Sequence, residues 1–273
     1  MQKLAPRLAE HMQVDSVRRS QSVPGAPCIH AAYYGDVSMP GTFTQLPTHY
    51  DFIVFCLSPG ERNERAYRKV FIDGLRHTLS HFSVSKTLQR IIFVSSTSVY
   101  HQDDSSWIDE NSPAQAHSFA GRVLREAEDS LQLSHLPATI VRFSGIYGGN
   151  RQHLISQVQN RQVAISTTLR LSNRIHEDDC VGFLEHLLRR ALAGDYLPPL
   201  FLASDDCPVD LSEVYQFIAD KINVSLATSE ALPTRRTGNK RCSNKRLHAS
   251  GYALQYPSFK EGYEAMLQNY AEG

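Results

Sequence analysis

The chain has 273 residues, and its 28 lysines and arginines balance its 28 aspartates and glutamates, so its formal net charge is zero. This balance excludes a protein that binds nucleic acid through an overall basic surface, and we expect no nucleic-acid partner. No apolar run approaches the ~20 residues needed to span a bilayer. The first residues, MQKLAPRLAEHMQ, carry charges throughout and are unlike a secretory signal. We therefore expect a cytoplasmic protein with no membrane partner.

The first half of the sequence alternates between helical and strand patterns. Leu4, Leu8 and Met12 recur at helical spacing and predict an amphipathic helix, and further helices are predicted over 62–82 and 117–132. Five segments have the composition of strands, and two of them, DFIVFCL and RIIFVSS, are continuous apolar runs typical of strands buried on both faces of a parallel sheet. These segments are VDSV (14–17), CIHAAYYGDV (28–37), DFIVFCL (51–57), RIIFVSS (90–96) and PATIVRFSG (137–145). The alternation predicts an α/β fold with a parallel sheet.

The second half is less regular. An apolar helix (181–192) follows NRIHEDD (173–179), and PLFLAS (199–204) predicts one more strand. Capping-box signatures, Asp210 with Glu213 and Ser258 with Glu261, predict the start of two further helices, and 243–251 fits a short helix that ends at a glycine. The basic run at 235–246 is interpreted as a solvated loop, with a phosphate-binding patch as the alternative.

The five cysteines are scattered and never form a C-x-x-C pair. Because neither disulfide nor tetrahedral metal-ligand spacing is present, we predict free thiols and no metal site. The residues are Cys28, Cys56, Cys180, Cys207 and Cys242.

Five stretches, in unbroken order, resemble the extended short-chain dehydrogenase/reductase family, also called NAD-dependent epimerase/dehydratases. They are IIFVSSTSVY (91–100), DENSP (109–113), TIVRFSGIYGG (139–149), NRIHEDD (173–179) and SDDCPVDLSEVYQFIA (204–219). The resemblance implies a Rossmann-like, doubly wound parallel sheet with a small C-terminal lobe. It implies an NAD(P)-binding domain over 1–150, and a substrate lobe over 151–273 from which segments return to the sheet.

The family's chemistry uses a serine, a tyrosine and a lysine four residues after the tyrosine. The resemblance places the serine at Ser96, the tyrosine position at Ser118 and the lysine position at Arg122. Serine is a poor general acid at neutral pH, and arginine stays protonated, so the usual proton transfer is expected to be lost. Tyr100 is a candidate replacement phenol, although it also fits a packed aromatic at a strand end.

The family's glycine-rich loop is absent. No G-x-G-x-x-G motif occurs anywhere in the sequence, so the backbone cradle for a pyrophosphate is missing. Because the first helix matches the one that follows this loop in the family, we expect the first strand to be missing too, leaving a gap between VDSV and DFIVFCL. Two explanations are open: a native start further upstream, which we favour, or a gap that is filled in another way.

Several residues match cofactor-binding positions of the family. Arg18, Arg19 and Ser20 close the strand that reads the adenosine ribose, where arginine suits the 2′-phosphate of NADP rather than NAD. An exposed arginine pair is the alternative for the first two. The remaining positions are Asp36 near the adenine, Leu57, Ser58 and Pro59 over the adenosine and pyrophosphate, and Ser95, Phe143 and Ser144 beside the nicotinamide. We expect NADP or NAD as cofactor, with binding weakened or lost without the cradle.

The resemblance places Arg174 and His176 against the substrate, where they would favour an anionic small molecule together with the end of the basic run. Alternatively, both side chains pair with Glu177 or Asp178. The helices at 62–82 and 117–132 would form a homodimer face in the family. Two functions are open: an NAD(P)-dependent oxidoreductase or nucleoside-diphosphate-sugar epimerase-like protein with degenerate catalytic residues, or a non-catalytic dinucleotide-responsive protein.

Overall fold

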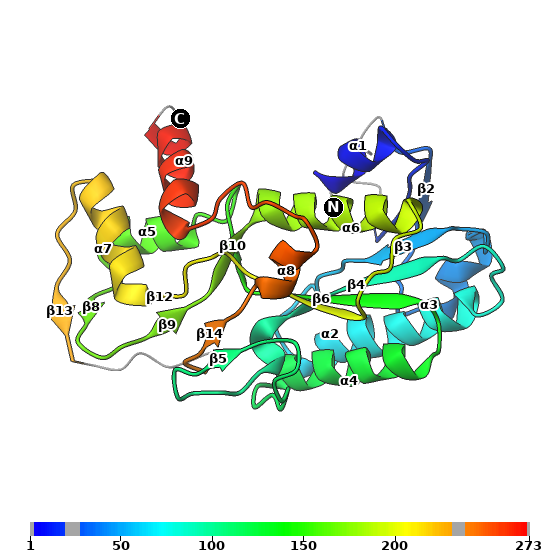
Figure 1. Cartoon of the computed structure of the whole chain (residues 1–273), viewed down its shortest axis with the longest axis horizontal. Coiled ribbons are helices and arrows are strands. Elements are labelled where there is room, and N and C mark those ends of the chain that lie inside the picture. The colour runs from blue at the N-terminus through cyan, green and yellow to red at the C-terminus, as the bar shows by residue number, and fades with distance from the viewer. Residues whose placement is uncertain (1–2, 20–27, 231–237, 272–273) are drawn as a thin grey trace. The chain divides into compact units, whose positions relative to one another are not determined.

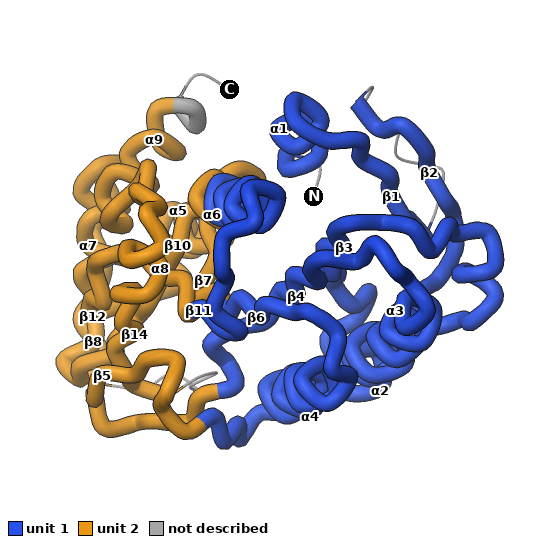
Figure 2. Tube along the Cα trace, turned by 45° about the vertical axis from the view of Figure 1, so that its right-hand side comes forward, with its two compact units in different colours: residues 1–99, 114–142, 181–201 blue, residues 100–113, 143–180, 202–273 orange. Residues whose placement is uncertain are grey.

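The structure is a computed structural model that describes residues 3–19, 28–230 and 238–271. The chain divides into two units that interleave in sequence (Figure 2). Unit 1 comprises Met1–Val99, Ala114–Arg142 and Val181–Phe201, and unit 2 comprises Tyr100–Pro113, Phe143–Cys180 and Leu202–Gly273. Because segments cross between the units several times, no single point in the sequence separates them.

The centre of unit 1 is a four-stranded sheet with the order β11-β6-β4-β3 (Figure 2). Figure 1 shows three of these strands, β6, β4 and β3, as labelled arrows. Ile91, Ile92 and Phe93 of β4 have no exposed surface, as predicted for a strand that is buried on both faces. β3 and β4 are parallel, with Phe52 opposite Arg90. The strands are β3 (Phe52–Phe55), β4 (Arg90–Ser96), β6 (Ala138–Phe143) and β11 (Leu200–Ala203), and the last residues of β6 and β11 belong to unit 2.

A second, two-stranded sheet lies in the same unit. β1 (Asp15–Arg18) pairs in parallel with β2 (Ala31–Tyr34), with Asp15 opposite Ala31. Among the described residues, no strand joins this pair to the four-stranded sheet. The described residues thus contain no strand between VDSV and DFIVFCL.

The helices of unit 1 follow the predicted pattern, with one irregularity. The expected helix over 62–82 consists of α2 (Glu64–Arg68), a π-helical segment η2 (Lys69–Gly74) and α3 (Leu75–Phe82). The Asn63 side chain caps it by accepting a bond from the backbone N–H of Ala66, 2.8 Å away. The other helical elements are α1 (Leu4–Ala9), the 3₁₀ segments η1 (Pro40–Gln45) and η3 (Thr97–Val99), α4 (Phe119–Leu133), and α6 (Glu177–Leu192), which begins in unit 2.

The first turn of α4 lies against η3, the segment that follows β4, and the contact is made at a glycine. A Cβ added to Gly121 would lie 2.2 Å from the carbonyl oxygen of Ser98 and 2.6 Å from the Cβ of Ala116. We expect Gly121→Ala to lower the free energy of unfolding by about 1–3 kcal/mol, because backbone atoms must shift to admit the methyl group. Urea denaturation measures the loss. Gly41→Ala is the control, since nothing lies within 4 Å of the added Cβ, and equal stabilities for the two variants would contradict the prediction.

Unit 2 is built from short strand pairs and four short helices. The predicted caps are present in it: Asp210 accepts from the N–H of Ser212 at the start of α7, and the N–H of Ser258 donates to Glu261 before α9. The helices are α5 (His153–Gln159), α7 (Leu211–Lys221), α8 (Lys245–Ala249) and α9 (Phe259–Ala271). The strand pairs are β5 (Trp107–Ile108) with β14 (Arg241–Cys242), β7 (Gly145–Tyr147) with β10 (Arg174–His176), β8 (Ile165–Ser166) with β13 (Thr228–Ser229), and β9 (Leu171–Ser172) with β12 (Val209–Asp210).

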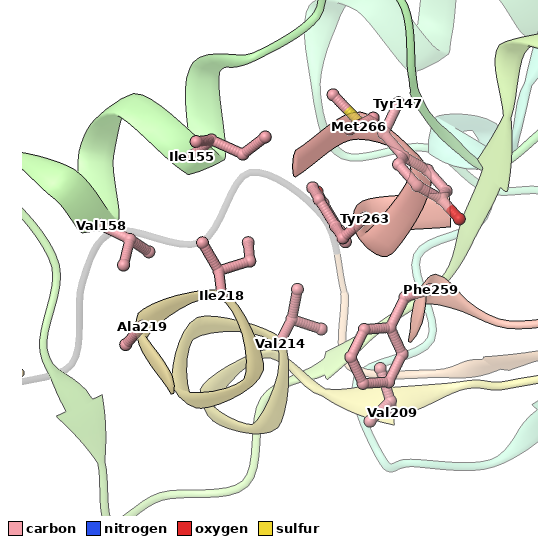
Figure 3. Close-up of a cluster of buried hydrophobic side chains, with 10 residues drawn as sticks. All are labelled: Tyr147, Ile155, Val158, Val209, Val214, Ile218, Ala219, Phe259, Tyr263 and Met266. Carbon is pink, nitrogen blue, oxygen red and sulfur yellow. The ribbon is translucent and has the colours of Figure 1, made fainter. Parts of the chain in front are cut away.

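A hydrophobic core between α5, α7 and α9 organises part of unit 2 (Figure 3). Val214 and Ile218 of α7 are completely buried there, and Phe259 and Tyr263 of α9 are 1% exposed. Burial of this kind provides the main stabilisation of helices too short to persist alone.

All five cysteines are free thiols, as predicted. No helix in the described part of the chain has the length and apolar character needed to cross a membrane.

Candidate functional site

Several predicted cofactor and catalytic residues of unit 1 lie where its strands end. Arg18 is the last residue of β1, Leu57 follows β3 closely, and Ser96 ends β4. In open α/β sheets, ligands bind at the carboxyl ends of the strands, so this edge is the candidate cofactor site. Ser20 lies outside the described residues.

Arg19 reaches from the end of β1 to the segment after β3. Its guanidinium lies against Gly60, where a Cβ would be 3.2 Å from Nη1. Arg19 is exposed and Arg18 is half-buried, so both charges are close to solvent. The Asp36 carboxylate accepts a bond from the N–H of Ser38, 2.9 Å away, and this bond lowers the pKa of Asp36, with smaller contributions from Arg19 and Lys69.

The loop after β3 is open to solvent. Leu57 and Ser58 are exposed, and the Ser58 hydroxyl donates a long bond to the carbonyl of Pro59, at 3.4 Å. These three residues are accessible, and their contact with a cofactor remains a prediction.

Ser95 is engaged differently from the prediction. Its hydroxyl is buried and donates to Oε1 of Glu128 at 2.6 Å. Glu128, on α4, also accepts from Arg142 of β6 at 2.9 and 2.6 Å and from Arg125 at 3.1 Å. The Ser95 side chain therefore belongs to a buried ion-pair network inside unit 1, and its position beside a nicotinamide remains a prediction.

The positions that match the family's catalytic residues have structural partners. The Ser96 Oγ accepts from the N–H of Ser98 at 3.1 Å. Ser118 is the N-cap of α4, and its Oγ accepts from the N–H of Gly121 at 3.1 Å. Arg122 is exposed and donates to the carbonyl of His117 at 2.5 Å. None of these arrangements supplies a titratable acid near neutral pH, because hydroxyl and guanidinium groups hold their protons there.

The sequence allowed two interpretations of Tyr100, a replacement phenol or a packed aromatic. In the structure this residue of unit 2 is a packed aromatic. The residue is 2% exposed, and its hydroxyl donates to the carbonyl of Asp109 at 2.8 Å. The alternative that this phenol replaces the missing acid is therefore not supported.

The predicted nicotinamide and substrate residues of unit 2 are buried. Phe143 is 2% exposed, and the buried Ser144 hydroxyl has no hydrogen-bond partner among the described residues. Arg174 donates to the Tyr263 hydroxyl at 3.3 Å and lies over the Tyr263 ring, with Cζ 5.8 Å from its centroid. The contacts of Arg174 described here are thus with Tyr263.

His176 is enclosed by aromatic rings. Its ring centroid lies 5.2 Å from that of Tyr147 and 3.9 Å from that of Tyr256. Its Nδ1 lies 3.6 Å from a carboxylate oxygen of Asp178, as the alternative interpretation required. A role of either Arg174 or His176 in binding an anionic substrate remains a prediction.

The basic run is only partly a solvated loop. Lys240 is 2% exposed and donates through Nζ to the carbonyl of Tyr100, and burial lowers its pKa. Arg246 lies 3.7 Å from a carboxylate oxygen of Glu110, while Lys245 is exposed. The interpretation as a solvated loop was wrong for Lys240, because the backbone carbonyl of Tyr100 accepts a hydrogen bond from its buried ammonium group. Residues 235–237 of the run lie outside the described residues.

Two buried aspartates of unit 2 were not among the predicted site residues. Asp179 accepts from the N–H groups of Gln255 and Tyr256 at 2.7 and 2.9 Å and so fixes the segment before α9. Asp205 is 1% exposed, one of its carboxylate oxygens has no partner among the described residues, and burial raises its pKa to about 8. The motif SDDCPVDL contains Asp205, but burial of one aspartate of the pair is not visible in the sequence.

The site fits a dinucleotide only in part. Arg18 and Arg19 suit a ribose phosphate at the end of β1. The family's glycine motif does not occur in the given sequence, so the described residues include no pyrophosphate cradle of that kind. Binding of the adenosine end of the family's cofactor to this unit remains a prediction.

Comparisons with solved structures place the whole chain. A protein from Methylobacillus flagellatus, described as an NAD-dependent epimerase/dehydratase, is 33% identical over 98% of this chain and 94% of its own, with a TM-score of 0.82. The Bordetella bronchiseptica enzyme WbmG, solved with NAD, is 13% identical over 99% of this chain and 90% of its own, with a TM-score of 0.79. DesIV, a dTDP-glucose 4,6-dehydratase from Streptomyces venezuelae solved with NAD and TYD, is 16% identical over 100% of this chain and 92% of its own, with a TM-score of 0.78.

No protein-family model and no curated protein matches the sequence. WbmG and DesIV share the fold, and the Methylobacillus flagellatus protein shares both the fold and a third of the sequence. The motifs, the parallel sheet and this similarity agree, and the chain belongs to the extended short-chain dehydrogenase/reductase family of NAD-dependent epimerases/dehydratases.

Proposed function

We propose that the protein is a dinucleotide-responsive binding protein of this family, which recognises NADP or NAD without carrying out the family's proton transfer. The proposal rests on the identity and the hydrogen bonds of the side chains at positions 118 and 122. Ser118 caps α4, and Arg122 bonds a carbonyl at the same helix end. Neither can exchange a proton with a substrate near neutral pH.

The dinucleotide part of the proposal is supported by Arg18 and Arg19 at the end of β1 and by the two structural neighbours solved with NAD. A cofactor of this class supplies hydride transfer when it is bound. Arginine at this position favours a 2′-phosphate, because a guanidinium makes strong charge-assisted bonds to phosphate oxygens. Without a pyrophosphate cradle, we expect a dissociation constant weaker than about 10 μM.

The preference for NADP can be tested with Arg19→Ala. We expect the variant to lose about tenfold or more in affinity for NADP and much less for NAD, because only NADP carries the phosphate that the guanidinium would bind. Isothermal titration calorimetry measures both affinities. Arg76→Ala is the control, since Arg76 is an exposed arginine of α3 that pairs with Asp73 of η2. Equal losses for NAD and NADP would rule out the 2′-phosphate role.

A second candidate function is catalytic turnover of a nucleotide sugar, favoured by the 33% identity to a protein described as an NAD-dependent epimerase/dehydratase. The double variant Ser118→Tyr/Arg122→Lys separates the two functions. If the proton transfer alone is missing, the pair should raise turnover by about 10²–10⁴-fold. The assay follows NADPH or NADH absorbance with a panel of nucleotide sugars, with Arg122→Lys alone as the control. Ordinary turnover by the unchanged protein, unaffected by Ser96→Ala, would show that it is an enzyme with another catalytic site.

A further inference from the structure

Three large hydrophobic side chains of unit 1 are at least 70% exposed among the described residues, and all of them lie just before a strand of the four-stranded sheet. Val84, Leu133 and Tyr196 are 70%, 75% and 77% exposed. Val84 lies between α3 and β4, Leu133 ends α4 shortly before β6, and Tyr196 lies between α6 and β11. We call the surface that these three residues form the strand-entry edge.

The entries to the three strands are adjacent in the folded unit. The N–H of Ile91 in β4 donates to the carbonyl of Pro137, just before β6, at 2.8 Å. The N–H of Ile140 in β6 donates to the carbonyl of Pro199, just before β11, also at 2.8 Å. β6 therefore has β4 on one side and β11 on the other, as Figure 2 shows. The exposed side chain that precedes β6 is thus the central one of the three.

Charged groups of opposite sign lie at the two ends of this edge. Lys86, in the segment before β4, is exposed and has no ion-pair partner in the described part of the chain. Asp195, in the segment before β11, accepts from Nε of Arg190 at 3.0 Å, and its side chain is still 48% exposed. The strand-entry edge therefore has a cation at its β4 end, a partly exposed carboxylate at its β11 end and an apolar centre.

We propose that the strand-entry edge is the contact surface of a symmetric dimer, and that its occupant is a second copy of this chain. A two-fold axis beside Leu133 brings the β4 end of one copy to the β11 end of the other. Lys86 of each copy then faces Asp195 of the other copy, and the apolar side chains pack between these two ion pairs. A two-fold interface must be self-complementary, and a surface with opposite charges at its two ends meets this condition.

This dimer differs from the one that the family resemblance implies, which uses the faces of the helices over 62–82 and 117–132. The strand-entry edge lies at or beyond the C-terminal ends of the corresponding helices, α3 and α4. The inference also does not depend on the proposed dinucleotide function, because the candidate cofactor site lies at the opposite, carboxyl ends of the strands.

The size and the charges of the edge determine how strong the dimer is. The three side chains, together with Leu192, which is 50% exposed, are few compared with the roughly 20–30 residues per partner of a standard interface. We therefore expect a weak, reversible dimer with a Kd of about 10–100 μM. The affinity should fall as the salt concentration rises, because salt screens the exposed ion pairs.

Sedimentation equilibrium of the full chain over about 1–200 μM measures the association, and we expect a monomer–dimer equilibrium in this range. Leu133→Asp should weaken the dimer at least tenfold, because it places a carboxylate in the apolar centre without a counter-charge. Met39→Asp is the matched control, since Met39 is 60% exposed and lies after β2, away from the strand entries.

An exchange of charges tests the two-fold arrangement. Lys86→Glu and Asp195→Lys should each weaken the dimer about threefold to tenfold, because each change places like charges opposite one another. The double variant Lys86→Glu/Asp195→Lys should regain most of the lost affinity, since opposite charges meet again. Circular dichroism establishes that the variants are folded. If Asp195→Lys does not fold, Leu133→Asp and Lys86→Glu still test the inference.

A chain that stays monomeric over the whole concentration range would overturn the inference. Equal weakening by Leu133→Asp and Met39→Asp, or no recovery in the charge-exchange variant, would also overturn it. Arg68 pairs with Glu126 between α2 and α4, so a dimer that is lost in Arg68→Glu and unchanged in Lys86→Glu would place the interface on those helices instead. NADP affinity is measured separately, so a failure of the proposed function leaves the result on self-association unaffected.

Discussion

Replacing Glu128 with alanine is expected to lower the free energy of unfolding by about 3–5 kcal/mol, because the change leaves a buried arginine without its counter-charge. Glu128 is completely buried, and the side chain of its partner Arg142 is 3% exposed. The carboxylate also accepts the bond from Ser95. The network connects α4 to β4 and β6, so its loss should loosen the strand that ends at Ser96.

Urea denaturation of Glu128→Ala and the unchanged protein gives this difference. Glu126→Ala is the matched control on the same helix: Glu126 pairs with Arg68 on the surface at 2.8 Å, and an exposed pair contributes about 1 kcal/mol or less. A double variant, Glu128→Leu/Arg142→Met, should recover much of the loss, since an apolar pair removes the unpaired charge. A loss for Glu128→Ala as small as that of the control would contradict the prediction.

Replacing Asp205 with asparagine is expected to make the protein more stable than the unchanged chain at high pH. Burial raises the pKa of Asp205 from 3.8 to about 8. A carboxyl whose folded pKa is raised favours folding while it is protonated, and this contribution is lost as the pH rises from about 4 through about 8. The advantage of Asp205→Asn should therefore grow across this range, towards an upper bound of about 6 kcal/mol, because one pKa unit corresponds to about 1.36 kcal/mol.

The measurement compares unfolding free energies of both proteins at pH 5 and pH 9, so that other titrating groups cancel. Asparagine retains the oxygen that accepts the bond from the N–H of Cys207 at 3.2 Å. Asp220→Asn is the control, because this carboxylate of α7 is exposed. An advantage of Asp205→Asn that does not change with pH would show that Asp205 is already ionised in the folded protein.

The sequence predicted the main strands of unit 1 because their signal is strong. RIIFVSS and DFIVFCL are apolar runs that become β4 and β3 nearly at the predicted bounds. The two-residue strands of unit 2, such as β8 and β13, have no such signal, since two residues cannot show a period. The π-helical turn at Lys69–Gly74 was missed for a similar reason, because its residues continue an ordinary helical pattern.

For the candidate site, the sequence predicted positions but not contacts. Motif order led to Ser96, Ser118 and Arg122 as the catalytic positions, and that assignment remains a prediction. The sequence does not show that Ser95 turns towards Glu128, since that bond joins residues 33 positions apart. For the same reason, the contacts of Tyr50 with Asp15 and of Arg19 with Gly60 became visible only in the folded chain.

The cap at the start of α4 also bears on how this lineage can evolve. Ser118 accepts the N–H of Gly121, and loss of such a cap costs a protein about 1 kcal/mol. A tyrosine at this position cannot make the same bond, so a mutation back to the family's residue would lower stability before any activity returned. Proteins function close to a stability threshold, and selection would remove that intermediate unless a second substitution compensated for it. The serine cap would thus oppose a change to tyrosine at the position where the resemblance places the family's acid.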